Sequence, residues 1–163
     1  MAELRLIKDF PKKGITFIDI TPKLIDKNDF NEIINKMCEQ VPKNVDYVVG
    51  PESRGYIFAS AIANKLAVGF IPIRKEGKLP NDLVYKTEYE KEYGTDILCL
   101  PKNDGYTGKN FYVVDDVLAT GGTLKACKKL INQCGGNYIG AGVYINIKNL
   151  NNENINSVLE FEE

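Results

Sequence analysis

The feature that most constrains this chain is a strand that leads into two adjacent acids and then into a loop that opens a helix. Residues 111–114 are apolar and β-type, Asp115 and Asp116 follow, and a helical pattern begins near residue 122. The loop between them consists of Ala119, Thr120, Gly121, Gly122 and Thr123. Free backbone N–H groups and the positive end of the helix dipole at such a loop suit a phosphate. We therefore predict a strand, a phosphate-binding loop and a helix in succession.

The two acids indicate more than a simple phosphate. Carboxylates beside a phosphate loop are useful when the ligand also carries hydroxyl groups or a metal ion. A phosphorylated ribose has the hydroxyls, and a pyrophosphate on it would bring Mg²⁺. The alternative is an ordinary turn rich in glycine, and Gly121, Gly122 and Thr123 alone would favour that alternative. The double acid after a hydrophobic strand favours the phosphosugar.

The composition narrows the chemistry and the setting. The 163 residues include no histidine, which excludes histidine-dependent catalysis and histidine-ligated metal sites. The 21 basic and 22 acidic residues are interspersed, so we expect no nucleic-acid partner. We also expect no membrane association and a cytoplasmic protein, because no apolar run has transmembrane length and the N-terminus lacks a secretory segment. Without a C-x-x-C pair, the cysteines are predicted to be reduced core residues: Cys38, Cys99, Cys127 and Cys134.

Hydrophobic periodicity predicts strands alternating with helices. The predicted helices span 29–40 with Asn28 as N-cap, 54–66 and 122–134, and the predicted strands span 45–49, 69–73, the region of Leu98 and Leu100, 110–114, 137–147 and 157–161. Residues 75–96 show no sustained apolar period and are interpreted as a lid loop, with a disordered surface insertion as the alternative. This order predicts a single α/β domain, a twisted sheet with a parallel core flanked by helices.

Three further groups of residues are candidates for ligand contacts. Ser53, Arg54 and Gly55 form a second turn from strand to helix, where Arg54 could bind an anion or only be solvated. Cations follow the strand at 69–73 and could neutralise a pyrophosphate or form a solvated face: Arg74, Lys75 and Lys78. In the N-terminal stretch, Phe17 could stack on a base or pack in a small subdomain.

Taken together, these motifs resemble the adenine branch of the type I purine phosphoribosyltransferase family. The resemblance spans residues 10–145 in order. It rests on Pro11, Gly14, Ile15, Phe17 and Asp19 to Pro22, on Gly50 with Ser53 to Gly55, on Ile73 to Lys75 with Gly77 to Pro80, on Glu92 to Gly94 and on Val113 to Thr123. The acidic motif with its loop is common to many phosphoribosyltransferases, and the other elements are narrower.

The resemblance implies the type I phosphoribosyltransferase fold with a small N-terminal hood (residues 1–27) and a flexible lid (75–96). It implies that adenine and 5-phosphoribosyl 1-pyrophosphate (PRPP) give AMP and pyrophosphate with Mg²⁺ in a homodimer. The two acids would hold the ribose hydroxyls, the phosphate loop the 5′-phosphate, and the six residues of the second turn and the cation group the pyrophosphate. Adenine would be bound by Phe17 and the main chain of Thr16 and Ile18. Glu92 and Tyr93 would be the catalytic residues on the lid, with Mg²⁺ held mainly through PRPP and by no dedicated protein site.

Two alternatives to this activity stay open at the level of sequence. A phosphoribosyltransferase for another purine would need donors for a 6-oxo group, and the sequence does not show the contacts along the edge of the base. A PRPP-sensing regulator without catalysis would need a further DNA-binding or partner-binding domain, for which 163 residues leave no room.

Overall fold

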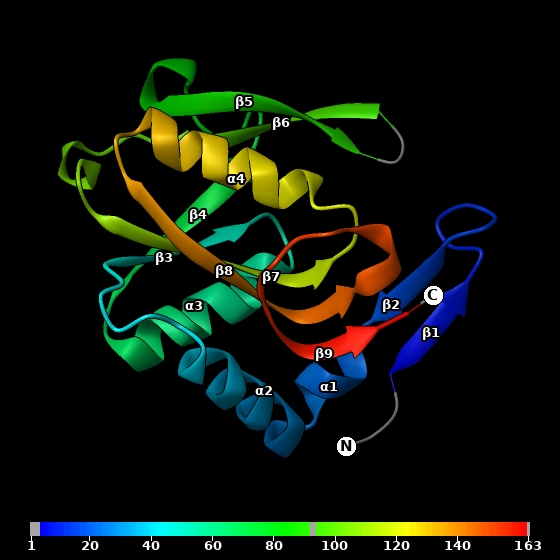
Figure 1. Cartoon of the computed structure of the whole chain (residues 1–163). Coiled ribbons are helices and arrows are strands. Elements are labelled where there is room, and N and C mark those ends of the chain that lie inside the picture. The colour runs from blue at the N-terminus through cyan, green and yellow to red at the C-terminus, as the bar shows by residue number, and fades with distance from the viewer. Residues whose placement is uncertain (1–3, 92–93, 163) are drawn as a thin grey trace.

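The computed structural model describes residues 4–91 and 94–162, and these form an α/β fold around a seven-stranded sheet of order β5-β6-β4-β3-β7-β8-β9 (Figure 1). The strands are β3 (Tyr47–Pro51), β4 (Gly69–Lys75), β5 (Val84–Lys91), β6 (Gly94–Pro101), β7 (Asn110–Leu118), β8 (Asn137–Ile147) and β9 (Asn156–Phe161). The helices are α1 (Thr21–Ile25), α2 (Lys27–Glu39), α3 (Gly55–Leu66) and α4 (Gly122–Gln133), and short 3₁₀ turns lie at Asn81–Leu83, Asp104–Tyr106 and Lys148–Leu150. The predicted fold class is confirmed.

The order of the strands reverses at the centre of the sheet. β3 pairs in parallel with β4 on one side and with β7 on the other, and β7 pairs in parallel with β8. The chain therefore leaves β3 through α3 towards one edge and leaves β7 through α4 towards the other. In open α/β sheets such a switch point leaves a crevice at the carboxyl ends of the strands, where ligands bind. Both predicted anion-binding turns, after β3 and after β7, lie at this place.

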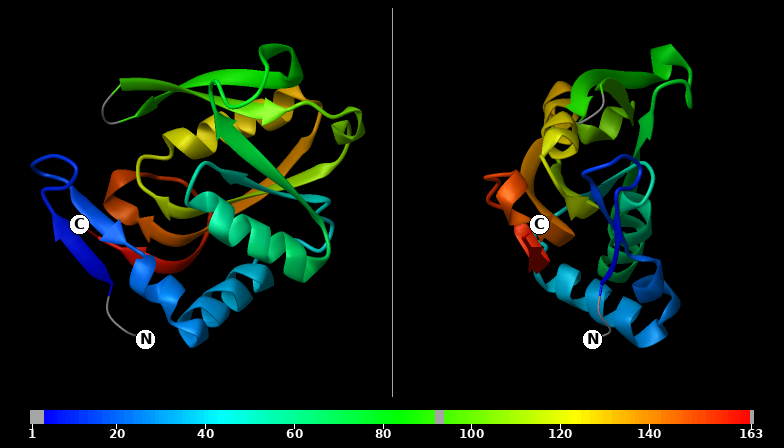
Figure 2. Two further views of the ribbon diagram at one scale, coloured as in Figure 1. Left: turned by 180° about the vertical axis from the view of Figure 1, so that it is seen from behind. Right: turned by 90° about the vertical axis from the view of Figure 1, so that its right-hand side faces the viewer.

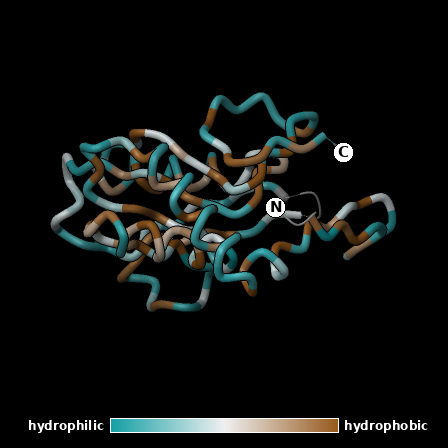
Figure 3. Tube along the Cα trace, turned by 90° about the horizontal axis from the view of Figure 1, so that it is seen from below, coloured by the Kyte–Doolittle hydropathy of each residue, from teal (hydrophilic) through white to brown (hydrophobic). Residues whose placement is uncertain are grey.

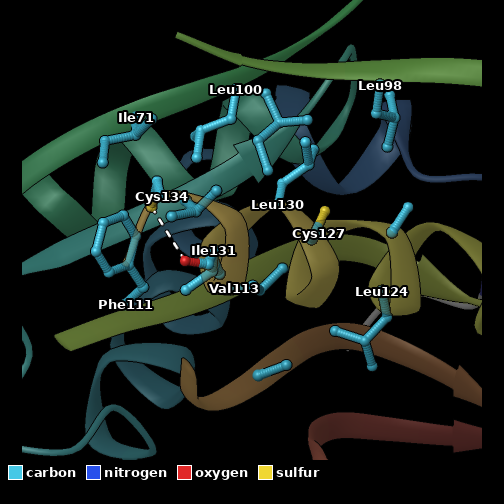
Figure 4. Packing of buried hydrophobic residues seen from close by; sticks show 14 of the residues in the cluster. Ile71, Leu98, Leu100, Phe111, Val113, Leu124, Cys127, Leu130, Ile131 and Cys134 are labelled. Atoms are coloured by element: carbon cyan, nitrogen blue, oxygen red, sulfur yellow. Dashed lines mark hydrogen bonds between the residues drawn. The ribbon is translucent and has the colours of Figure 1, made fainter. Parts of the chain in front are cut away.

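The two faces of the sheet carry separate hydrophobic cores, with α4 on one face and α2 and α3 on the other (Figure 2). On the first face, apolar side chains of α4 point at the sheet from successive turns (Figure 4): Leu124, Cys127, Leu130, Ile131 and Cys134. Leu130 and Ile131 have no exposed surface, and burial of each such side chain contributes about 1.5–3 kcal/mol. Seen from below, hydrophobic stretches recur along the trace through the body of the protein, whereas the loop that leads towards the C-terminus is mostly hydrophilic (Figure 3).

Several boundaries differ from those predicted from the sequence. Helix α2 begins two residues early, because Asp26 rather than Asn28 is its N-cap and accepts hydrogen bonds from the amides of Asn28 and Asp29, both at 2.9 Å. β7 continues to Leu118, so both acids belong to the strand. The helix end predicted from the glycine pair is confirmed, since Gly135 follows α4 with φ of +77°.

The prediction of a loop over residues 75–96 is wrong. Most of the described residues in this range form β5 and β6, which pair antiparallel from Val84 with Pro101 to Lys91 with Gly94. These strands are stabilised by cross-strand pairing. Because the hairpin lies at an edge of the sheet with one side in solvent, its sequence is mixed and polar and shows no pattern typical of a strand. We call β5 and β6 the hairpin, and Figure 1 shows it lying across α4.

The hood is a small structure of its own. β1 (Arg5–Lys8) and β2 (Thr16–Asp19) form a two-stranded antiparallel sheet that is separate from the main sheet. Arg5 forms an ion pair with Asp19 across these strands. Ile18 and Ile20 are buried in the core beneath α2 and α3, so they fix the hood to the body. In Figure 1 the hood lies at the end of the sheet where the parallel strands terminate.

The structure also shows the state of the cysteines and the length and character of the helices. All four cysteines are free, with Cys99, Cys127 and Cys134 buried and Cys38 half-buried, as predicted for unpaired core residues. Burial raises the pKa of each thiol, which disfavours the reactive thiolate. Within the described ranges, no helix combines the length and apolar character needed to span a bilayer.

Candidate functional site

The acidic pair lies at the carboxyl end of β7, next to the turn that follows β3. Asp116 is 5% exposed, and its Oδ2 is 2.7 Å from Nε of Arg54. Oδ1 of Asp115 accepts a hydrogen bond from the amide of Asp116 at 2.9 Å. Burial, and after it the charge of Asp116, raises the pKa of Asp115 well above its ordinary value. A pair held in this way favours ligands that bring hydroxyl donors or positive charge.

The predicted phosphate loop, residues 119–123, connects β7 to α4 and lines a cavity together with Asp115. Gly121 precedes the helix with φ of +87°, a left-handed conformation that favours glycine. The cavity continues inward between β7, β8 and α4, where its walls are Val113, Cys127, Ala141 and Val143 among others. The loop that opens α4 and the carboxylate of Asp115 therefore line the same cavity.

The turn after β3 approaches the acidic pair so closely that only glycine fits at its end. A Cβ atom at Gly55 would lie 2.8 Å from Oδ1 of Asp115 and 2.8 Å from Cδ of Pro51. Gly55 is the first residue of α3, so the opening of that helix also points to the acids. The structure thus brings Ser53, Arg54 and Gly55 to the same crevice as the phosphate loop.

Arg54 joins the hood to the acidic pair. In addition to its ion pair with Asp116, its Nη1 donates to the carbonyl oxygen of Ile18 at 3.3 Å. Its guanidinium carbon lies 4.9 Å from the centroid of the Phe17 ring, within the range of a cation–π contact. The alternative of a merely solvated arginine is therefore wrong for this structure. Sequence reasoning missed this contact with the hood, because residues 18 and 54 come together only through the tertiary fold.

An apolar pocket opens between the hood and the phosphate loop. Its lining includes the three residues predicted to bind a base, Thr16, Phe17 and Ile18, together with Arg54 and Thr120. The remaining walls come from the hood, from the end of β7 with the loop after it, and from the end of β8 with the 3₁₀ turn after it: Pro11, Gly14, Ile15, Val117, Ala119, Ile147 and Leu150. Sequence reasoning missed Ile147 and Leu150, because they are ordinary apolar positions until the fold brings them to the same pocket as Phe17.

The cations predicted to follow the strand at 69–73 have fewer contacts with the crevice, and Arg74 and Lys75 belong to β4, which is longer than predicted. The amide of Lys75 donates to Oε2 of Glu52 at 2.9 Å, and this bond ties the end of β4 to the turn after β3. Burial raises the pKa of Tyr56 to about 12, while nearby Arg74 acts in the opposite direction. The side chains of Lys75 and Lys78 are exposed and make no ion pair with any residue that the structure describes. Arg74 and Lys75 therefore lie near the turn after β3, which forms one side of the crevice.

The predicted catalytic residues, Glu92 and Tyr93, lie outside the described residues. The strand that precedes them does approach the phosphate loop, because a Cβ atom at Gly122 would lie 2.6 Å from the carbonyl oxygen of Glu90. A second pocket lies between the hairpin and α4 and is lined by Glu88, Glu90, Thr120, Lys125 and Lys129 among others. The hairpin is thus in contact with the loop that was predicted to bind the phosphate.

Comparison with known sequences agrees with the family resemblance of the sequence motifs. The model of a family described as the phosphoribosyl transferase domain matches residues 19–156. The adenine phosphoribosyltransferase of Clostridium perfringens strain 13 is 47% identical over 149 residues, which cover 91% of this chain and 86% of that protein.

Solved structures agree with the sequence comparison. The adenine phosphoribosyltransferase of Thermoanaerobacter pseudethanolicus has a TM-score of 0.88 at 41% identity, covering 97% of this chain and 95% of the other. The enzyme of Saccharomyces cerevisiae, complexed with D-2,5-dideoxy-2,5-imino-altritol 1,6-bisphosphate and adenine, has a TM-score of 0.82 at 36% identity and covers 90% and 86%.

Proposed function

The chain belongs to the adenine phosphoribosyltransferase family, and we propose that it transfers the 5-phosphoribosyl group from PRPP to adenine, giving AMP and pyrophosphate in purine salvage. The observation that carries this proposal is the arrangement at the switch point of the sheet. An acidic pair, a phosphate loop at a helix opening and an apolar pocket with an aromatic wall share residues and lie side by side. That order matches the hydroxyls, phosphate and base of a nucleoside monophosphate.

Each part of the crevice would hold one part of the substrates. Asp115 and Asp116 accept hydrogen bonds from the ribose hydroxyls, and the backbone amides of the phosphate loop donate to the 5′-phosphate. Adenine stacks on Phe17 in the apolar pocket, with the main chain of Thr16 and Ile18 at its edge. Because Arg54 covers the Phe17 ring and bonds to the Ile18 carbonyl in this structure, its guanidinium must shift when the base enters.

The pyrophosphate would lie on the side of the crevice formed by the turn after β3 and the end of β4. The residues proposed to bind it are Ser53, Arg54, Gly55, Arg74, Lys75 and Lys78. Arginine and lysine are suited to this role because their donors match phosphate oxygens and neutralise charge. Arg54, once displaced from Phe17, is placed to turn towards this side while staying near Asp116.

Mg²⁺ fits this site as an ion that arrives with PRPP. Among the described residues no three His, Cys, Asp or Glu side chains are grouped so as to hold a metal, and two adjacent carboxylates with a raised pKa at Asp115 favour a nearby cation. Asp115 and Asp116 would face the ion through the ribose hydroxyls. Bound there, Mg²⁺ would neutralise charge on the departing pyrophosphate.

Bond cleavage between ribose and pyrophosphate develops positive charge on the sugar, so stabilisation of the leaving group and exclusion of water are the main tasks of the protein. The acidic pair lies beside the sugar, where negative charge stabilises such a cation. We propose Glu92 as the group that handles the proton of the purine and Tyr93 as its partner in covering the crevice. The contact between Glu90 and Gly122 supports a hairpin that reaches the reacting groups.

Adenine should be converted far better than hypoxanthine or guanine. The motivation is the resemblance of the stretch around Phe17 and of Arg74 to Pro80 to the adenine branch of the family, together with the apolar side chains Val117, Ile147 and Leu150 in the pocket that Phe17 lines. Pyrophosphate release should be measured with each base at saturating PRPP and Mg²⁺. A faster rate with a 6-oxopurine would assign the protein to another purine, and failure with every base would leave only PRPP binding.

We further propose that the protein works as a homodimer. Lys75 and Lys78 are exposed and point to no partner within the described part of the chain, so they are free to meet a ligand or a neighbouring subunit. The hood also exposes apolar side chains, including Leu6, Ile7 and Phe10. Sedimentation equilibrium at micromolar concentration should give twice the mass of the chain. A fully active monomer would contradict this proposal.

The proposed location is the cytoplasm. The four unpaired cysteines, three of them buried, agree with a reducing compartment. PRPP and adenine are charged or polar small metabolites, and their enzyme has to share the compartment in which they are found.

A further inference from the structure

The segment that follows β8 returns to the phosphate loop and is tied to it by one side chain, Asn151. Its Nδ2 donates to the carbonyl oxygens of Ala119 and Ile147, both at 2.9 Å, and to Oδ1 of Asn146 at 3.0 Å. Two hydrogens serve three acceptors, so one of the bonds is shared. Ala119 is the first residue of the phosphate loop, and Ile147 is the last residue of β8.

The opposite side of the same amide fixes its orientation. Oδ1 of Asn151 accepts a hydrogen bond from the amide of Glu153 at 3.0 Å. Backbone carbonyls on one side and a backbone N–H on the other leave no choice between the two ends of the amide. Glu153 in turn packs against Gly121, where a Cβ would lie 3.3 Å from its Cγ, and its Oε1 is 3.5 Å from Nζ of Lys125. The segment therefore contacts the phosphate loop at two residues, Ala119 and Gly121.

The acceptor side chain of Asn146 depends on this contact. Asn146 has no exposed surface, and its Nδ2 has no partner among the described residues. The bond from Asn151 is the side-chain hydrogen bond that the structure records for it. Loss of the donor would leave buried acceptors unpaired, which costs more than the bond itself. We therefore expect the local structure to depend on the hydrogen-bond donor of the side chain at position 151 more than on the size of that side chain.

We propose that Asn151 is a positioning residue, which holds the phosphate loop in the conformation that binds the 5′-phosphate and keeps it in register with the end of β8. This inference rests on the proposed function, because it assigns the loop to the phosphoribosyl group. Ala119 and Ile147 both line the apolar pocket, so the same side chain also sets the distance between two of its walls.

The test replaces the donor without changing the shape. Asn151→Asp puts a carboxylate oxygen against three acceptor oxygens and keeps the acceptor for the Glu153 amide. We expect the KM for PRPP and the Kd for ribose 5-phosphate to rise about tenfold or more, with a smaller change in kcat, because the loss is one of binding geometry. Asn152→Asp is the matched control, since it adds the same charge one residue away on an exposed side chain. It should change both constants by less than about twofold.

The outcomes separate this inference from the proposed function. Equal ribose 5-phosphate affinity in Asn151→Asp and the wild type overturns the positioning role, as does an equal loss in Asn152→Asp. A wild type that binds ribose 5-phosphate but forms no AMP overturns the proposed function and leaves the positioning role to be decided by the same titration. If circular dichroism shows that Asn151→Asp does not fold, Asn151→Ala decides, with weakened binding expected and unchanged binding contradicting the inference.

Discussion

Replacing Asp116 by asparagine should weaken PRPP binding by about tenfold to more than a hundredfold while the protein stays folded. The variant keeps the shape of the side chain but removes the charge that faces Nε of Arg54 at 2.7 Å. A hydrogen bond to a charged acceptor contributes about 1.5–3 kcal/mol, which corresponds to that loss of affinity. The same change at Asp115 should act in the same direction. Calorimetric titration with PRPP and Mg²⁺ measures the effect.

Stability provides the control for this prediction. Asp115 has a raised pKa because of burial and the charge of Asp116, so removing one of the two charges relieves repulsion in the free protein. We therefore expect little loss of thermal stability, in contrast to the loss of binding. Asp82→Asn removes an exposed charge on the 3₁₀ turn before β5 and should change neither quantity. Unchanged PRPP affinity at both acids would show that their role is structural.

Replacing Glu92 by glutamine should lower kcat for adenine by about 10²–10⁴-fold, because a positioned acid or base typically contributes that much. PRPP affinity should change much less, since an interaction made mainly in the transition state affects turnover rather than ground-state binding. The position follows β5, whose Glu90 carbonyl lies against Gly122 in the phosphate loop. Single-turnover measurement with saturating PRPP separates the chemical step from product release.

Glu88→Gln is the matched control for Glu92→Gln. It removes the same kind of charge four residues earlier, at an exposed position on β5. A normal rate in Glu88→Gln together with a slow rate in Glu92→Gln assigns the effect to one carboxylate. If Glu92→Gln turned over adenine at the wild-type rate, proton transfer would not depend on this residue. Catalysis would then rest on the acidic pair, the phosphate-binding groups and the exclusion of water.

The parts of the fold that sequence could predict are those with a strong local signal. The apolar face of α4 and its C-cap, from Leu124 to Cys134, is predicted by its period of 3.6 and is buried in the structure. The alternation of strands and helices, which predicts a sheet with a parallel core, follows from hydrophobic periodicity as well. The strand predicted at Leu98 and Leu100 is part of β6, but β5 and its pairing with β6 could not be predicted in this way. A strand at the edge of a sheet with one face in solvent lacks a continuous apolar run, and its pairing is decided by its neighbours in the sheet.

The candidate site likewise has a part that the sequence could predict and a part that it could not. The acidic pair and the phosphate loop were found because strand, acids, glycines and helix follow one another within thirteen residues of sequence. The contacts of Arg54 with Phe17 and of Asn151 with Ala119 join residues more than thirty positions apart. Neither arginine nor asparagine has a local pattern that announces such a partner. Those contacts exist only once the carboxyl ends of the parallel strands are brought together.

The separate two-stranded sheet of the hood has a consequence for the history of the family. Strands β1 and β2 share no backbone ladder with the main sheet and are held by Ile18 and Ile20. The hood residues that are proposed to contact the base can therefore change without disturbing the pairing of β3 and β7, where the sugar and phosphate groups are proposed to bind. During evolution the binding site for the sugar and phosphate groups can therefore be kept while the binding site for the base changes. A single ancestral fold can in this way give rise to enzymes for different bases.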